Sequence, residues 1–158
     1  MLVNLHVKNL AIIDEVDIDF SNGLNILTGE TGAGKSIIIG SINLALGSKV
    51  SKDIIRDKAA FALVELVFSY SDNSIRKFLE DAQIECEDNE IIISRKITQS
   101  RSISKVNGET VTLSFVQELA SMLIDIHGQH DNKMLINPLE HISILDSFIK
   151  DEAKDVMD

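Results

Sequence analysis

The order of hydrophobic and polar residues predicts strands at the start of the chain. Residues 1–7 are strand-like, and apolar and acidic side chains alternate over 16–20, which is the period of a strand with one face in water. After a turn at 21–23, the mostly apolar residues 24–28 predict a short strand buried inside a sheet. We therefore expect a β-layer to precede the rest of the fold.

Helix and strand signals then alternate. An apolar run over 37–46 predicts a helix with Gly47 as its C-cap, and the polar residues 48–58 are expected to form a loop. The pair Asn107-Gly108 is the strongest signal for a tight turn. The patterns around these points predict strands over 61–70, 90–98 and 101–106 and a short helix over 74–84.

The hydrophobic period becomes helical from Ser114 onward. Ser114 and Gln117 fit a capping box at the start of this helix. A polar loop over 125–133 follows, and Asn137 with Pro138 then begins a last helix.

Residues 29–36 read Gly-Glu-Thr-Gly-Ala-Gly-Lys-Ser and match the phosphate-binding loop of nucleotide hydrolases. The glycines let successive N–H groups surround a phosphate, and the following helix directs its positive end at the same anion. In this interpretation Lys35 reaches the β- and γ-phosphates and Ser36 binds Mg²⁺. The predicted nucleotide-binding residues are Gly29, Glu30, Thr31, Gly32, Ala33, Gly34, Lys35, Ser36 and Ile37.

Composition limits the classes of protein that remain. The chain has 158 residues, the size of one domain, and its 44% hydrophobic and 25% charged residues are typical of globular proteins. The absence of a long apolar run and of a leader predicts a cytoplasmic protein without membrane contact. Cys86 is the only cysteine, which excludes an internal disulfide. The net charge of -10 means that any nucleic-acid contact is local or supplied elsewhere.

The chain resembles the RecN family of bacterial DNA-repair proteins, which are SMC-like ABC ATPases. The resemblance covers nearly the whole chain and is carried by NLHVKNLAIIDEVDIDFSNGLNILTGETGAGKS, SRKITQSRSISKVNGETVTL and DIHGQHDN. It implies an α/β fold: the N-terminal half of a P-loop NTPase head of ABC type, with an antiparallel β-layer beside the core sheet. It also implies a head half over 1–137 and a helix over 138–158 that leads toward a coiled coil.

The resemblance assigns further site residues. Gln129, in a glutamine loop over 127–131, would position water and Mg²⁺, and Arg56 would reach the nucleotide. The alternatives are a solvated loop amide for Gln129 and a plain surface arginine for Arg56. The signature segment and the catalytic carboxylate of the family are missing from this sequence and belong to a C-terminal half. The chain by itself is therefore expected to hydrolyse ATP hardly at all.

The implied whole protein is an ATPase for repair of DNA double-strand breaks. Its cofactors are ATP and Mg²⁺, and its partners are the C-terminal half of the same head, a second head that closes over two ATP molecules, and DNA. It would be cytoplasmic and act on the bacterial nucleoid.

Two groups of polar residues allow more than one interpretation. Arg95, Lys96, Arg101 and Lys105 could contact DNA phosphates, or they could be charged residues of a sheet edge that prevent aggregation. His127, His130 and Asp131 could be drawn as a metal site, or they could belong to a loop that orders against nucleotide.

Two other functions compete with the ATPase. A small P-loop kinase would need a lid with clustered arginines and a base for the acceptor, and neither is evident. A nucleotide-gated interaction module without catalysis would use the apolar last helix to recruit partners.

Overall fold

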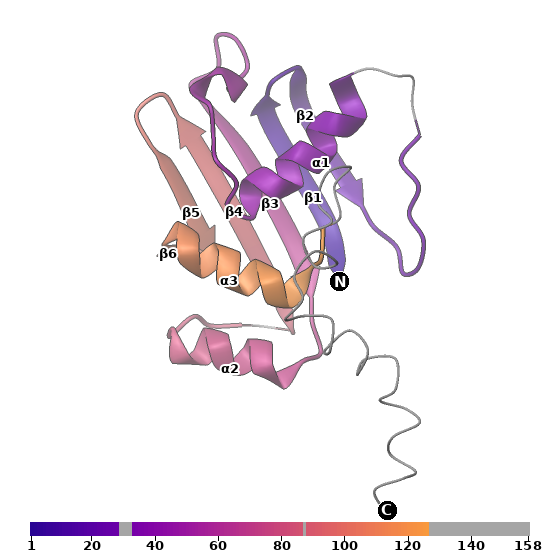
Figure 1. Cartoon of the computed structure of the whole chain (residues 1–158), viewed down its shortest axis with the longest axis vertical. Helices are drawn as coiled ribbons and strands as arrows, with labels where there is room; N and C mark the ends of the chain where they lie inside the picture. Colours follow the sequence, from indigo (N-terminus) through magenta and orange to yellow (C-terminus); the bar gives the residue numbers. More distant parts are fainter. Residues whose placement is uncertain (29–32, 87, 127–158) are drawn as a thin grey trace, which may run out of the picture. The chain divides into compact units, whose positions relative to one another are not determined.

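The computed structural model describes residues 1–28, 33–86 and 88–126. The chain divides into two compact units, Met1–Ile124 and Asp125–Asp158, and the first unit is shown in colour in Figure 1. The predicted boundary between 137 and 138, and the helix expected beyond it, lie outside the described residues and stay predictions.

The first unit is built on a six-stranded sheet with the strand order β2-β1-β3-β4-β5-β6. Every neighbouring pair of strands is antiparallel. The strands are β1 (Leu2–Leu10), β2 (Ile13–Asp19), β3 (Phe61–Ser69), β4 (Glu90–Thr98), β5 (Ser102–Val106) and β6 (Glu109–Val111). The antiparallel β-layer expected from the sequence is thus present, and β6 is a strand that the sequence patterns did not predict.

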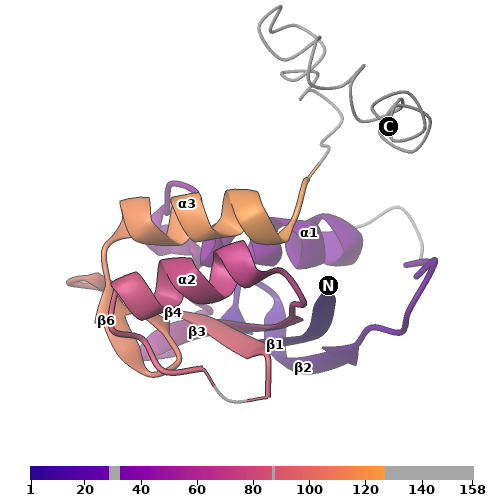
Figure 2. The same cartoon turned by 90° about the horizontal axis from the view of Figure 1, so that it is seen from below.

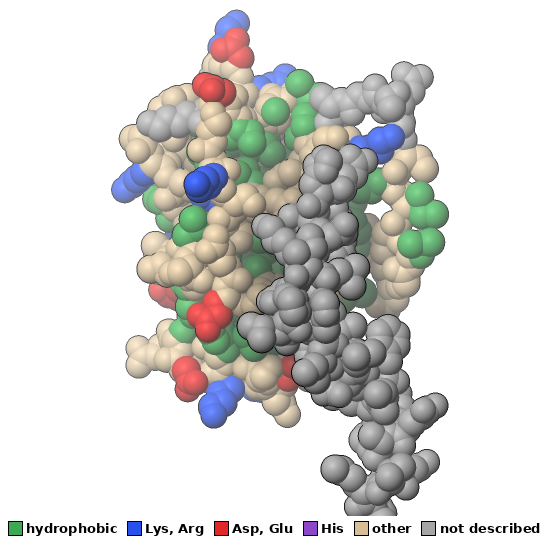
Figure 3. Space-filling model, in the orientation of Figure 1, with side chains coloured by type: hydrophobic (Ala, Val, Ile, Leu, Met, Phe, Trp, Pro, Cys, Tyr) green, Lys and Arg blue, Asp and Glu red, His purple; other side chains and the backbone are tan. Residues whose placement is uncertain are grey.

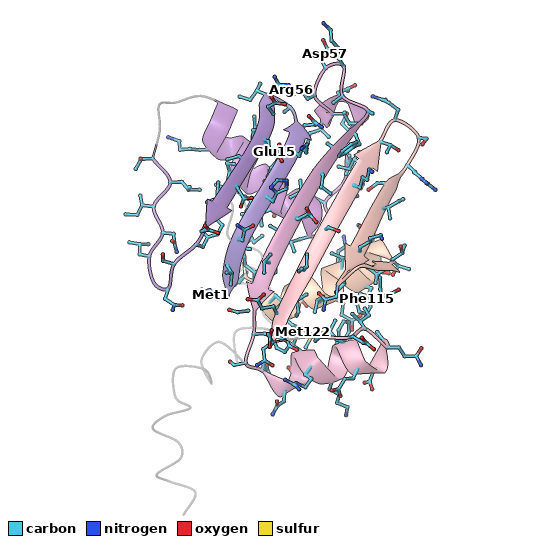
Figure 4. The ribbon with its side chains drawn as sticks, turned by 180° about the vertical axis from the view of Figure 1, so that it is seen from behind. Met1, Glu15, Arg56, Asp57, Phe115 and Met122 are labelled. Atoms are coloured by element: carbon cyan, nitrogen blue, oxygen red, sulfur yellow. The ribbon has the colours of Figure 1, made fainter. Side chains whose placement is uncertain are left out.

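Of three α-helices, the first and the last lie over one face of this sheet, and the middle one lies beyond the ends of the strands, beside the last helix (Figures 1 and 2). The three helices are α1 (Ala33–Ala45), α2 (Asn73–Asp81) and α3 (Leu113–Leu123), and a short 3-10 helix, η1, covers Lys52–Ile54. Helix α1 packs over β1, β3 and β4, and α3 packs against α2 and β5. Figure 4, seen from behind, shows that no described helix covers the opposite face, which we call the open face.

The core lies between the sheet and the helices, because alternate residues of each central strand point toward the helices. On β3, Ala62, Val64, Leu66 and Phe68 are all fully buried. The strand register sets Leu66 beside Leu5 of β1 and Ile93 of β4, so apolar side chains form rows across the sheet. The helices add Leu44, Ile75, Leu79, Val116 and Leu119.

The strand predicted over residues 24–28 does not form. These residues pair with no described strand, and the side chains of Leu24 and Ile26 are 87% and 72% exposed. Apolar composition predicts burial, but burial requires a neighbouring strand, and none of the described strands supplies one. Figure 3 shows the hydrophobic side chains of this segment on the surface at the right of the view.

Helix boundaries also differ from the prediction, and α2 ends at Asp81, three residues earlier than expected. Helix α1 begins at Ala33, four residues earlier than expected, so the end of the glycine-rich loop already has helical backbone. Helix α3 is capped by Thr112, whose side chain accepts a hydrogen bond from the Phe115 amide at 3.2 Å, and the predicted capping box at Ser114 is wrong. Thr112 takes this role because β6 ends at Val111, one residue before it.

Candidate nucleotide-binding site

The described part of the predicted phosphate loop is the first turn of α1. Lys35 lies half-buried in this turn and Ser36 is exposed. The first N–H groups of a helix have no partner inside the helix and stand at the positive end of its dipole, so an anion is stabilised there. The predicted roles of Lys35 as a cation for phosphate and of Ser36 as a hydroxyl ligand for Mg²⁺ stay predictions. Residues 29–32 lie outside the described residues.

The position of this turn follows from the packing of α1 on the sheet. Ile38 and Leu44 are buried beneath the helix, and Ser41, fully buried, donates a hydrogen bond from Oγ to the Ile38 carbonyl at 2.7 Å. Ile39, on another side of α1, is 50% exposed. The helix is therefore fixed to the sheet by one face.

Arg95 does not fit the predicted group of DNA contacts. It is 4% exposed on β4, on the side that faces the helices, and its Nη1 donates to the carbonyls of Leu44 at 2.6 Å and Ser48 at 2.8 Å. Its Nε donates to Ser102 Oγ at 2.9 Å. A DNA phosphate could reach this guanidinium only if these bonds broke, so the structure corrects this assignment and gives Arg95 a structural role.

The other three basic residues of that group are exposed. Lys96 projects from the open face and lies 4.3 Å from the centre of the Phe61 ring, a cation–π contact. Arg101 and Lys105 are also exposed, and Lys105 pairs with Ser94 in the sheet. Their contact with DNA stays a prediction.

Arg56 lies in the loop that follows η1 and is anchored to the turn between β1 and β2. Its Nη1 donates to the Ile12 carbonyl at 3.1 Å, its main-chain N–H donates to the Asn9 carbonyl at 2.9 Å, and its Nε lies 4.0 Å from Asp14 Oδ1. A surface hollow of about 520 Å³ adjoins it. Figures 1 and 4 show this turn at the end of the sheet where α1 begins. The contact of Arg56 with nucleotide stays a prediction.

The glutamine loop falls outside the described residues, and with it Gln129, His127, His130 and Asp131. Within 1–28, 33–86 and 88–126, no group of three or more His, Cys, Asp or Glu side chains could hold a metal ion. No helix in the same ranges is long and apolar enough to cross a membrane.

A polar cluster on the open face joins β1 to β2, and sequence reasoning missed it. His6 lies with Nδ1 3.1 Å from Asp17 Oδ2 and Nε2 3.5 Å from Glu15 Oε1. Asn4 donates to Asp17 at 2.6 Å, and Lys8 Nζ lies 2.9 Å from Glu15. The available signal was the alternation of polar residues in both strands, which becomes a set of pairs only when the hairpin register is known.

The comparisons with known proteins agree with this geometry. A family model for the AAA domain matches residues 4–155. The DNA repair protein RecN of Bacillus subtilis (strain 168) is 40% identical over 159 residues, and the match covers 99% of this chain and 28% of that protein. RecN of Rickettsia prowazekii (strain Madrid E) is 38% identical over 94% of this chain and 26% of its own length. The chain thus spans little more than a quarter of these relatives.

Solved structures show the same fold at lower identity. A chain from a study of ATP-driven dimerization and DNA stimulated activation of SMC ATPases has a TM-score of 0.65 at 24% identity, over 93% of this chain and 98% of that one. An Smc head domain from Pyrococcus furiosus, bound to the C-terminal domain of ScpA, has a TM-score of 0.66 at 22% identity, over 99% of this chain and 46% of that one. The predicted fold class and the family resemblance are both confirmed.

Proposed function

Since the chain belongs to the AAA domain family, we propose that it is the ATP-binding N-terminal part of a RecN-like ATPase for repair of DNA double-strand breaks. The observation that carries the proposal is the junction at residues 29–36. There a phosphate-loop sequence runs directly into α1, and Lys35 and Ser36 occupy the first turn of that helix.

In this proposal, each part of the site has a task. Amides at the start of α1 and the Lys35 ammonium bind the β- and γ-phosphates, because they present donors and positive charge at one place. The Ser36 hydroxyl is a ligand for Mg²⁺, which neutralises phosphate charge when it is bound. Arg56, in the loop that follows η1, extends toward the nucleotide, and Gln129 orients the attacking water.

The rest of the same head completes the site. Residues 24–28 lead directly into the phosphate loop, and their apolar side chains are exposed in this chain. A strand from the C-terminal half would pair with this segment and cover it, as burial of apolar surface favours. The catalytic carboxylate comes from that half as well, so the chain alone hydrolyses ATP slowly.

In the whole protein, two heads close over two ATP molecules. Closure depends on the bound nucleotide, and the movement of the heads is passed on to DNA. Lys96, Arg101 and Lys105 are the exposed basic residues that are available for phosphate contacts on the hairpin of β4 and β5. The protein acts in the bacterial cytoplasm, on the nucleoid.

Substitution of Lys35 tests the site directly. Lys35→Ala removes a charge-assisted contact worth about 1.5 to 3 kcal/mol and should lower the affinity for Mg-ATP at least about tenfold, measured by calorimetric titration. Lys77→Ala, on the exposed face of α2, is the matched control and should bind as the unsubstituted chain does. Equal binding by Lys35→Ala would contradict the assignment.

Reconstitution tests the function of the whole protein. Addition of the C-terminal segment in trans should restore ATP hydrolysis, because it supplies the missing carboxylate and covers residues 24–28. Phosphorylation of a small metabolite by this chain alone would instead favour a kinase, and nucleotide binding without hydrolysis by the reconstituted head would favour an interaction module.

A further inference from the structure

The carbonyl end of α1 is held by an arginine from the middle of the sheet. Arg95 of β4 reaches the Leu44 carbonyl within the helix and the Ser48 carbonyl just beyond it, at 2.6 and 2.8 Å. Its third bond, from Nε to Ser102 Oγ at 2.9 Å, fixes the plane of the guanidinium from β5. One side chain therefore joins the end of the helix to two strands.

The position suits a positive charge although it is buried. In the described part of the chain no carboxylate lies within ion-pair distance of Arg95, and burial lowers its pKa. The guanidinium nevertheless remains charged at neutral pH, because arginine loses its proton only at very high pH. The carbonyls at the end of α1 carry the negative end of the helix dipole, which stabilises this charge.

A second contact, from α3, holds the same turn. Gln117 of α3 donates from Nε2 to the Gly47 carbonyl at 3.0 Å. Gly47 has a φ of +106°, and an added Cβ would lie 2.6 Å from Gln117 Cγ. The turn after α1 is thus enclosed between Arg95 and α3.

We propose that Arg95 is a positioning residue for nucleotide binding, which acts by fixing the carbonyl end of α1 and thereby the place of Lys35 and Ser36. This inference rests on the proposed function. The helix transmits position along its length: Lys35 stands nine residues before Leu44, about 13 Å along the axis. A tilt of about 5° at the held end would displace the first turn by about 1 Å. A displacement of this size is enough to misalign Lys35 and Ser36 with the phosphates.

Lysine would not replace this arginine. The guanidinium fork reaches three acceptors at once, whereas an ammonium is a compact point charge on a flexible stem. Arg95→Lys therefore keeps the charge at the helix end and loses the fixed geometry. Arg95→Gln loses both, and Ser102→Ala removes only the bond that fixes the plane.

The experiment is a Mg-ATP titration of the whole protein at a temperature where circular dichroism shows every variant to be folded. Arg95→Lys should bind about tenfold more weakly, Arg95→Gln more weakly still, and Ser102→Ala a few-fold more weakly. Arg76→Gln, at an exposed arginine of α2, is the matched control and should bind normally. Arg95→Lys and Ser102→Ala carry the test if Arg95→Gln does not fold.

A double-mutant cycle separates positioning from general loss of stability. If Arg95 acts through the first turn of α1, Arg95→Lys should cost much less affinity in a Lys35→Ala background than in the unsubstituted protein. Full affinity of folded Arg95→Lys, or strictly additive losses, would overturn the inference alone. Failure of the unsubstituted protein to bind ATP would overturn the proposed function, and this inference with it.

Discussion

Asp17 shows at the scale of one residue how the hairpin changes acid–base chemistry. A hydrogen bond from Asn4, and then the contact with His6, lower the pKa of Asp17 from its ordinary value of 3.8. Because the folded-state pKa is the lower one, the unfolded chain takes up a proton first as pH falls. The stabilisation from Asp17 is therefore fully present above 3.8 and is lost as pH falls through the folded-state pKa.

Asn4→Ala should raise the pKa of Asp17 toward its ordinary value, because Asn4 supplies the largest stabilisation of the carboxylate. An NMR titration of the Asp17 carboxyl carbon measures this change. Asn25→Ala is the control, since the bonds that Asn25 makes to described residues all lie within its own turn. An Asp17 titration that is the same in both variants would show that the bond from Asn4 is unimportant.

Arg95 and Lys96 are neighbours in sequence with opposite surroundings. In a strand they must point to opposite faces, and Arg95 has the same parity as the buried residues Ile93 and Ile97. That parity was visible in the sequence. The role of Arg95 was not visible, because its two carbonyl acceptors lie about fifty positions earlier, at the end of α1.

At the scale of elements, Gly40 within α1 and Gly47 in the turn after it have opposite expectations. Gly47 ends the helical turn in the left-handed region, whereas Gly40 lies inside the helix with nothing near its missing side chain. Gly47→Ala should lower the free energy of unfolding by about 1 kcal/mol or more, because it combines strain in φ with the clash against Gln117. Gly40→Ala should raise that free energy by about 0.5 to 1 kcal/mol.

Urea unfolding measures both changes. In the Gly47→Ala protein, the further change Gln117→Ala should recover part of the loss, because it removes the clash and leaves the strain in φ. A Gly47→Ala protein as stable as the unsubstituted one would mean that the backbone at this turn differs from the structure.

Local signals defined most elements but not their partners. The strand over 90–98 and the tight turn at Asn107-Gly108, where both residues have positive φ, agree with the sequence patterns. The failure at 24–28 has a different origin, since pairing depends on a strand distant in sequence. For the same reason, residues 29–36 predicted that a helix follows the phosphate loop, but not that its first turn begins at Ala33 or which contacts hold its other end.

At the scale of the whole molecule, residues 24–28 are exposed in the described fold although their apolar composition is typical of a hydrophobic core. Leu24 and Ile26 lie in water, whereas the apolar residues of the central strands that face the helices, such as Leu66 and Ile93, are fully buried. Exposed apolar groups of this kind favour association between molecules.

The double variant Leu24→Ser, Ile26→Ser should therefore reduce self-association of the chain in sedimentation velocity experiments. Its free energy of unfolding should change little, because these side chains bury little area in this chain. Ile12→Ser, at an exposed position in the turn between β1 and β2, is the control and should associate as before. Unchanged association of the double variant would mean that another surface mediates self-association.

The bonds at the end of α1 also set an order of events during folding. They join Ser48 to Arg95 and Gly47 to Gln117, across 47 and 70 positions of the chain. Closing loops of this length loses entropy before the contacts can stabilise the fold, so local hairpins form before these long-range bonds. On the ribosome, a growing polypeptide would therefore fix the end of α1 in its final place only after α3 has emerged.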